Sequence, residues 1–251
     1  MIYISNELSH HGVKGQKWGV RNGPPYPIED TTLRKGTKIN SISGVSNSKA
    51  YKNSGKWLYT YNPDDEWDNK VYKGPFAVYL ARNRGKQYLY EHQYEVVKDL
   101  KMPTKKERID EFIKTYNTDV DTYSKEMAWV QKQLKQYNVG SKESQNVDFS
   151  KLKTDADYKA AYEVFNHAME NMNVFKMTKA YAKTMSTKYD AMVDDNNQGI
   201  YNEAHDPVII FRANQALKPV AKARTVTYNE ILQNYKDVHK ELDKKGVAVK
   251  L

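Results

Sequence analysis

The chain has 251 residues, of which 39% are hydrophobic, and its 40 Lys and Arg against 31 Asp and Glu leave a formal net charge of +9. This apolar content can build a core, which excludes wholesale disorder, and no run approaches the roughly 18 apolar residues of a membrane helix. The absence of cysteine excludes disulfides, zinc fingers, iron–sulfur clusters and thiol catalysis.

The first predicted element is an extended N-terminal arm, which we place at residues 1–30. Residues 8–27 are basic and glycine-rich, and three of their last four residues are proline, which can continue neither a helix nor a central strand. Residues 1–12 lack the cationic region and apolar run of a secretory signal, so we expect none. The rest, residues 31–251, is predicted to be one domain.

Short strands are predicted over residues 33–100. The runs are compact, rich in β-branched and aromatic residues and separated by turn signals. They lie at residues 38–43, 56–61, 76–80 and 87–97. In the last run Tyr88, Tyr90, His92, Tyr94 and Val96 alternate with other residues, which predicts a strand with one buried face.

The period changes from two to that of a helix at Pro103. Thr104 and Glu107 have the spacing of a capping box, in which each side chain binds an amide of the first turn. From Ile109 to Tyr137, apolar residues recur at alternating steps of four and three, which predicts one long central helix. That helix could pack its seam on its own domain or associate with a second copy of the chain, and both possibilities stay open.

Further helices and strands follow. A second helix is predicted from residue 154 and a third over residues 174–186, which makes residues 104–187 a helical insertion. Strands are predicted at residues 189–193, 207–211 and 217–226, and Thr227 and Glu230 open a last amphipathic helix. Strands, then helices, then strands predict an α+β domain with a mixed or antiparallel sheet core.

The net charge does not by itself indicate a nucleic-acid-binding domain. Residues 1–50 contribute +4 and residues 201–251 contribute +3, while the middle of the chain is nearly neutral. In the middle, Lys alternates with Glu or Asp, as on a solvated helix face. We therefore expect no membrane partner and no sequence-specific nucleic-acid partner, and only non-specific polyanion contact by the termini remains open.

The most specific string in the chain is SHHGVKGQKWGVR, residues 9–21. It combines flexible glycines, one aromatic anchor and three cations, as in a peptide arm that inserts a ring into a pocket and places charges at its rim. Adjacent histidines without a carboxylate at ligand spacing do not indicate a metal site. The arm could also dock on its own domain. The predicted partner-binding residues are His10, His11, Lys14, Lys17, Trp18 and Arg21.

This string resembles the HHGxKGQKWGxR motif of head-associated and minor head proteins of tailed bacteriophages and prophages of Gram-positive bacteria. The resemblance covers about a dozen residues. It implies an accessory protein of the phage head, without catalytic activity, that docks on head or portal-proximal proteins or on a host protein. The implied location is the virion, the cytoplasm of the host bacterium, or both.

A second, weaker resemblance spans residues 31–235. The order of its segments is similar to a C-terminal module of phage minor head proteins that is distantly similar to ADP-ribosyltransferases. That family would hold NAD with an Arg at the position of Ser41, whereas Arg34 lies seven residues earlier. Thr60 would be the hydroxyl of the nicotinamide pocket, and Glu203 the carboxylate that steadies the ribosyl cation.

Because Ser41 replaces the expected Arg, the main hypothesis is a non-catalytic protein that needs no cofactor. The alternative is an NAD-dependent mono-ADP-ribosyltransferase that acts on host proteins. A second alternative is a phage inhibitor of a host defence protein. No Gly-rich nucleotide loop, HExxH or GxSxG pattern occurs in the sequence.

Overall fold

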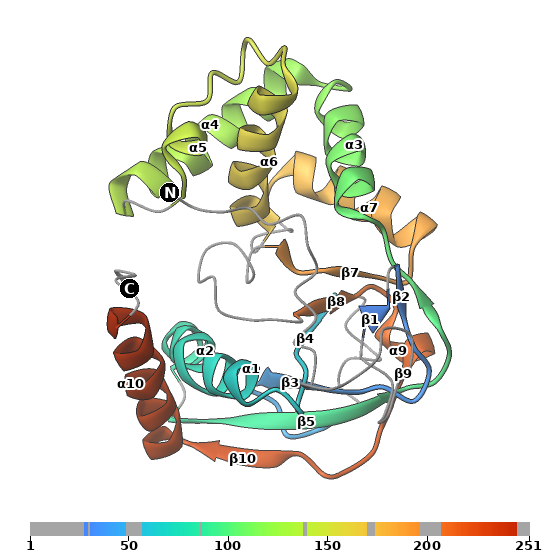
Figure 1. Cartoon of the computed structure of the whole chain (residues 1–251), viewed down its shortest axis with the longest axis vertical. Coiled ribbons are helices and arrows are strands. Elements are labelled where there is room, and N and C mark those ends of the chain that lie inside the picture. The colour runs from blue at the N-terminus through green and yellow to red at the C-terminus, as the bar shows by residue number, and fades with distance from the viewer. Residues whose placement is uncertain are drawn as a thin grey trace, which may run out of the picture.

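The computed structural model describes residues 28–29, 31–48, 57–85, 87–137, 140–169, 174–195 and 207–244. These residues form an α+β fold whose strand pairs are all antiparallel, as the sequence predicts (Figure 1). The strands are β1 (Ile28–Glu29), β2 (Thr32–Leu33), β3 (Lys38–Ser43), β4 (Leu58–Thr60), β5 (Tyr88–Val96), β6 (Leu100–Lys101), β7 (Ala191–Val193), β8 (Val208–Ile210), β9 (Leu217–Pro219) and β10 (Arg224–Thr227). The helices are α1 (Glu66–Val71), the π-helix η2 (Tyr72–Phe76), α2 (Ala77–Arg84), α3 (Lys105–Tyr116), α4 (Val120–Tyr137), α5 (Lys142–Gln145), α6 (Asp155–Met169), α7 (Lys176–Lys188), α9 (Ala213–Ala216) and α10 (Tyr228–Lys244).

Strand β5 organises the larger sheet. One of its edges pairs with β3, and the other pairs with β10 and then β9. A second sheet has the order β4-β8-β7, and β1, β2 and β6 form a third, small one. The first two sheets meet at a single bridge between Asn40 and Tyr61, whose backbone groups exchange two hydrogen bonds of 2.9 Å. In Figure 1, β5 and β10 run along the bottom and the second sheet lies above them.

The β4-β8-β7 sheet separates two apolar cores. Met192 and Ile209 point into a core shared with α3, α4, α6 and α7. The alternate residues Ala191, Val208 and Ile210 point into a core shared with β3 and β5. The second sheet therefore lies between the group of helices at the top of Figure 1 and the larger sheet.

A third core lies where α1, η2, α2 and α10 cover the larger sheet. Leu89 of β5 and Val226 of β10 pack there against Tyr72 of η2 and Val238 of α10. The region holding α1, η2 and α2 includes residues 76–80, which the sequence analysis assigned to a strand, and that assignment is wrong. Asp65 caps α1 by accepting a hydrogen bond from the Asp68 amide, and the packing of η2 and α2 on α10 favours helix and outweighs the strand propensity of Phe76, Val78 and Tyr79.

The long helix predicted from residue 104 is in fact two helices. The capping box at its start is confirmed, with both reciprocal bonds present. The helix breaks at residues 117–119 (Asn-Thr-Asp), whose short polar side chains compete for the backbone. Thr118 donates to the Thr115 carbonyl at 2.7 Å, and Asp119 accepts a hydrogen bond from the Thr122 amide to begin α4.

The predicted seam on these helices is buried within the domain for most of its length. Its members Tyr123, Met127 and Val130 pack in the same core as residues of α6 and α7. Val120 is an exception, because it begins α4 and is 38% exposed. Most of the seam therefore packs against other helices of the same domain, which is one of the two arrangements left open for residues 109–137.

Truncating the seam at Val130 should destabilise the fold, whereas the same change at Val120 should not. Val130→Ala removes two buried methyl groups and leaves a cavity, with an expected loss of about 2 kcal/mol in the free energy of unfolding. Val120→Ala, on the same helix, should change it by less than about 0.5 kcal/mol. Urea denaturation of the two variants measures the difference, and equal losses would contradict this packing.

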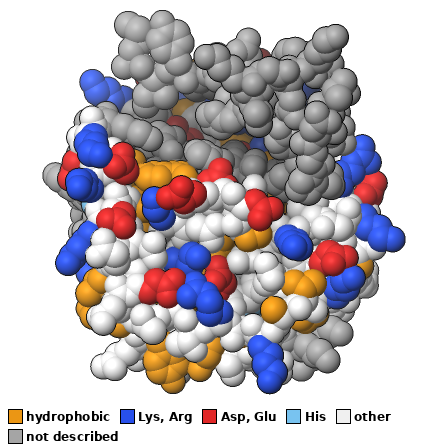
Figure 2. Space-filling view, turned by 60° about the horizontal axis from the view of Figure 1, so that its bottom comes forward, with side chains coloured by type: hydrophobic (Ala, Val, Ile, Leu, Met, Phe, Trp, Pro, Cys, Tyr) orange, Lys and Arg blue, Asp and Glu red, His pale blue; other side chains and the backbone are white. Residues whose placement is uncertain are grey.

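The single strand predicted for residues 217–226 is two strands, β9 and β10, both paired with the same edge of β5. Strand β9 ends at Pro219, and the Val220 amide that follows still donates to the Gln93 carbonyl of β5 at 3.1 Å. Figure 2 shows the face at the bottom of Figure 1, where basic and acidic side chains are interspersed and neither sign dominates.

Candidate functional site

The residues that the second resemblance singles out lie around the junction of the two main sheets. Ser41 and Thr60 are each one residue from the bridging pair, on the neighbouring strands β3 and β4. Thr60 is fully buried and donates its hydroxyl to the Val208 carbonyl at 2.9 Å. Arg34 is placed apart from them, before β3, where its guanidinium contacts Asp99 at 2.9 Å. The structure therefore brings Ser41 and Thr60 together and leaves Arg34 apart from them. Glu203 lies outside the described residues.

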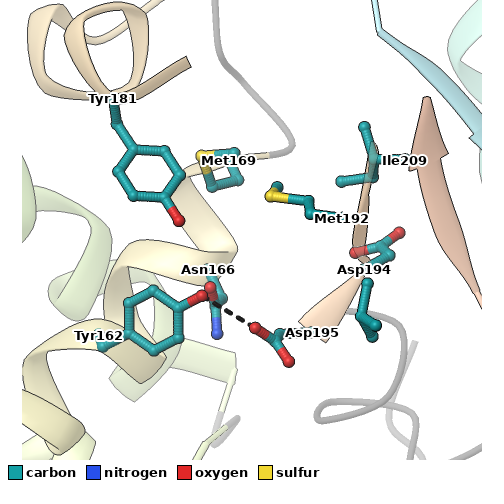
Figure 3. A pocket seen from close by; sticks show the side chains of 9 residues that line it. Tyr162, Asn166, Met169, Tyr181, Met192, Asp194, Asp195 and Ile209 are labelled. Atoms are coloured by element: carbon teal, nitrogen blue, oxygen red, sulfur yellow. Dashed lines mark hydrogen bonds between the residues drawn. The ribbon is translucent and has the colours of Figure 1, made fainter. Parts of the chain in front are cut away.

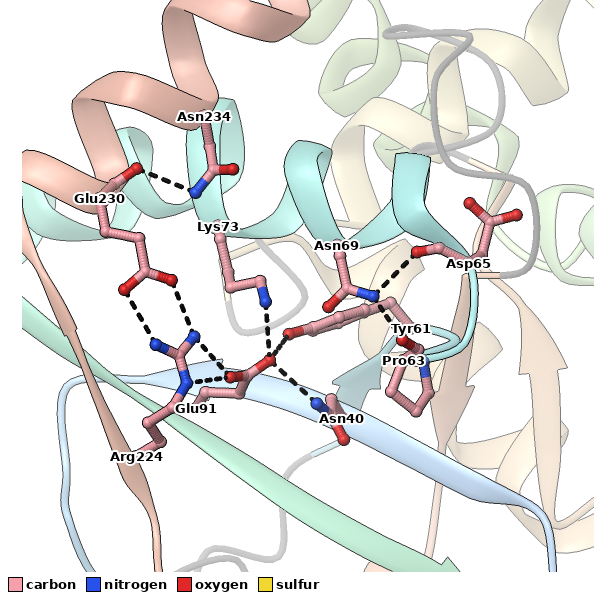
Figure 4. Close-up of polar contacts among 10 residues, drawn as sticks. All are labelled: Asn40, Tyr61, Pro63, Asp65, Asn69, Lys73, Glu91, Arg224, Glu230 and Asn234. Carbon is pink, nitrogen blue, oxygen red and sulfur yellow. Dashed lines mark hydrogen bonds and ion pairs between the residues drawn. The ribbon is translucent and has the colours of Figure 1, made fainter.

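The most connected polar group at the junction is the Glu91 carboxylate of β5 (Figure 4). Both bridge residues bind it, with Asn40 donating through Nδ2 at 2.9 Å and Tyr61 through its hydroxyl at 2.6 Å. The Arg224 Nε donates to the other carboxylate oxygen at 2.8 Å, and Lys73 Nζ lies 3.4 Å away. The side chains that meet here therefore come from β3, η2, β5, β10 and the residue after β4.

These contacts keep Glu91 ionised. Burial alone would raise the pKa of its carboxyl group, but the hydrogen bond from Tyr61, the charge of Lys73 and the hydrogen bonds from Arg224 and Asn40 outweigh burial and lower the pKa to about 2. Arg224 is itself held by a two-pronged contact with Glu230, at 2.8 and 2.9 Å. A carboxylate with this many donors holds the junction together and is poorly suited to accept a proton.

The stability of the protein should depend on pH through Glu91. Its pKa is 4.5 when unperturbed and about 2 when folded, so the stabilisation is complete above pH 4.5 and is lost as the pH falls towards 2. Glu91→Gln should cost about 2 kcal/mol at pH 7, and the gap to the native protein should close as the pH approaches 2. Urea denaturation across this range measures the gap. Glu143→Gln, at an exposed carboxylate of α5, should have little effect, and a gap at Glu91 that stayed constant would contradict the assignment.

On the opposite face of the same strands lies a buried histidine between hydroxyl groups. His92 is the β5 partner of Ser41, and its Nε2 lies 2.8 Å from the Ser43 hydroxyl. Its Nδ1 lies 3.0 Å from the Ser48 hydroxyl, and burial lowers the pKa of the ring. The Ser41 hydroxyl is buried and has no hydrogen-bond partner among the described residues. A serine beside a histidine is one part of a nucleophilic triad, but here the second ring nitrogen contacts a hydroxyl where a triad would have a carboxylate.

A second polar cluster lies in the helical half of the molecule, beside a small open hollow lined by residues of α6, α7, β7 and β8 (Figure 3). Arg108 of α3 is buried and grips Asp195 through two nitrogens, at 2.7 and 2.9 Å. The Tyr162 hydroxyl donates to the same carboxylate at 2.8 Å. No sequence pattern points to Arg108 or Tyr162 as members of a polar site, and the pair Asp194-Asp195, just after β7, is typical of a loop turn.

Glu91 was also missed, although a signal for it exists. The period-two pattern of β5 puts Glu91 opposite the tyrosines, on the face expected to be exposed, yet Glu91 is buried because α1, η2, α2 and α10 cover that face. The signal would have been a pair of opposite charges at facing positions of two neighbouring strands, because Arg224 of β10 lies opposite Glu91 of β5.

The remaining predicted residues cannot be placed. The arm string with His10, His11, Lys14, Lys17, Trp18 and Arg21 lies outside the described residues. Within those residues, no three His, Asp or Glu side chains are grouped so that they could hold a metal ion. The described helices include none with the length and apolar character needed to cross a membrane.

Comparison with known proteins gives one match. The model of a family of unknown function, DUF7211, matches residues 1–25, which include the arm string. No curated protein and no solved structure matches the chain. The matched residues all precede β1, which begins at Ile28.

Proposed function

We propose that the protein is an accessory component of tailed-phage heads that attaches through its N-terminal arm, residues 1–27, and presents the α+β domain as its body. The observation that carries the proposal is the arm string, which resembles a motif of phage head-associated proteins. The match of a family model to residues 1–25 supports it, because it delimits the same segment as a unit shared with other proteins.

The residue types of the arm suit attachment to a protein. Trp18 offers a large rigid ring for a pocket, and Lys14, Lys17 and Arg21 can contact polar groups at its rim. The matched segment also ends before the first strand of the body, so the two parts can be separated by a cut after residue 27. The body would then keep every strand pair and core described above.

Deleting residues 1–27 should abolish association with phage heads and leave the body folded. Co-sedimentation with purified heads measures association, and thermal unfolding followed by circular dichroism measures stability. A drop of several degrees in the melting temperature would contradict the proposal, because it would mean that the arm is part of the core.

A full-length variant provides the matched control. Trp18→Ala should weaken co-sedimentation strongly, whereas Trp129→Ala, which changes a tryptophan of the body that is 55% exposed, should leave it unchanged. The protein should also be found by mass spectrometry in purified virions. Its absence from virions, with heads that retain their other components, would exclude the proposal.

The alternative, an NAD-dependent ADP-ribosyltransferase with a fold like that family's, is favoured by one observation. Ser41 and Thr60 flank the bridge between the larger sheet and the β4-β8-β7 sheet, on the neighbouring strands β3 and β4. Glu203 belongs to the segment that joins the paired strands β7 and β8.

The two functions are separated by NAD binding. For the head-attachment function we expect no heat of NAD binding in calorimetry and no transfer of labelled ADP-ribose to host lysate. A transfer activity in the native protein that Glu203→Gln abolishes would favour the alternative. Glu143→Gln, at an exposed carboxylate of α5 outside these residues, serves as the control for that assay.

A further inference from the structure

One surface of the helical half combines exposed apolar side chains with four lysines that form no ion pair with another described residue. Trp129 of α4 is 55% exposed, and Val174, two residues before α7, is 67% exposed. Lys125 and Lys132 lie four residues before and three after Trp129, so they share its face of α4. Lys176 and Lys179 lie one helical turn apart at the start of α7. We name this surface, made by Lys125, Trp129, Lys132, Val174, Lys176 and Lys179, the lysine–tryptophan patch.

The patch is built on a rigid junction between α4 and α7. The Trp129 ring packs on the ring of Phe175, with centroids 5.7 Å apart and an angle of 52° between the planes. The Glu126 carboxylate of α4 accepts hydrogen bonds from the Lys176 and Met177 amides, at 2.8 and 3.0 Å, and so caps α7. The exposed ring is therefore held in place before any partner binds.

The lysines of the patch have no carboxylate partner among the described residues. Other lysines of the helical half do, since Lys106 of α3 pairs with Asp110 at 2.6 Å and Lys188 of α7 pairs with Glu111. The carboxylate of Glu126, the residue after Lys125, is engaged by the two amides of α7. The patch therefore differs from the face in Figure 2, where charges of both signs are interspersed.

We propose that the lysine–tryptophan patch binds single-stranded nucleic acid without sequence preference. An exposed aromatic ring flanked by cations is the arrangement on which bases stack while the cations follow the phosphates. All four cations are lysines, which act on phosphates as point charges, whereas arginine would be expected for two-pronged contacts with the carboxylates of an acidic protein. This binding goes beyond the head-attachment function and does not depend on it.

The test uses the full chain and a fluorescein-labelled oligodeoxythymidylate of about 15 nucleotides, with binding followed by anisotropy at several salt concentrations. Trp129→Ala should weaken binding about tenfold, because a stacked base is lost. The double variant Lys125→Gln/Lys132→Gln should weaken binding and reduce the slope of log K against log salt by about 1.4.

Matched controls distinguish binding of the probe by the patch from binding by the net positive charge of the whole protein. Lys236→Gln/Lys240→Gln changes two exposed lysines of α10, and Tyr228→Ala removes a ring that is 53% exposed. Both should leave the affinity within about twofold of the native protein, and thermal unfolding confirms that each variant is folded.

Three outcomes would overturn the proposal. The first is equal weakening by the α4 and α10 lysine pairs, which would mean that net charge alone binds the probe. The second is unchanged affinity in Trp129→Ala. The third is competition by polyglutamate as effective as that by unlabelled oligonucleotide, which would assign the patch to an acidic protein.

Discussion

Arg108→Met should lower the free energy of unfolding by about 3–5 kcal/mol. The Arg108 side chain is buried and grips Asp195 through two hydrogen bonds, while a third goes to the Pro103 carbonyl. Removing the cation leaves the Asp195 carboxylate, only 11% exposed, without its charge partner. Urea denaturation at pH 7 measures the loss.

The same helix supplies the control. Lys106 pairs with Asp110 at 2.6 Å, but its side chain is 83% exposed, so Lys106→Met should cost about 0.5 kcal/mol or less. The double variant Arg108→Met/Asp195→Leu should recover part of the loss, because neither charge is then left buried alone. Equal effects at Arg108 and Lys106 would show that the buried pair contributes no more than a surface pair.

Gly74→Ala should destabilise the protein by about 3 kcal/mol or more. A Cβ atom at Gly74 would lie 2.7 Å from the Tyr235 nitrogen and 2.8 Å from the Asn234 carbonyl carbon, both in the backbone of α10. Backbone of a packed helix cannot move aside as a flexible side chain can, so α10 must shift from the core it shares with η2. Denaturant unfolding followed by circular dichroism measures the effect.

Gly85→Ala separates this collision from the general cost of replacing a glycine. Gly85 ends α2 with φ of +58°, and apart from its chain neighbours no atom of the described part of the chain lies within 4 Å of a Cβ built there. Its replacement should therefore cost only the left-handed strain of a residue with a side chain, about 1 kcal/mol. A loss at Gly74 no larger than that at Gly85 would contradict the close approach of α10.

Sequence patterns predicted the structure correctly where the residues that form a contact lie close together in the sequence. The capping box of Thr104 and Glu107 is complete, because both partners lie within one helical turn. At Thr227 and Glu230 only half of the predicted box forms: the Glu230 amide binds Thr227, but the Glu230 carboxylate turns to Arg224. Arg224, six residues before Glu230, competes there with the local amide, and the capping-box spacing alone does not reveal that competition.

The candidate sites were harder to predict because they depend on what covers each strand. The alternation of β5 predicted one buried face, but α1, η2 and α2, just before it in the chain, and α10, far after it, also bury the other face and with it Glu91. The link between Arg108 and Asp195 spans 87 positions in the sequence. No periodicity within α3 or within the segment after β7 indicates that these two residues meet.

The position of β5 at the centre of the larger sheet has a consequence for the order of folding during synthesis. Glu91 bonds Asn40, 51 positions away, and Arg224, 133 positions away. Contacts of such long range form slowly, and the strand partners β9 and β10 leave the ribosome after helices α3 to α7. Helices α3 to α7 are complete by residue 188 and can pack on one another first. During synthesis, one edge of β5 therefore stays unpaired until β9 and β10 have left the ribosome.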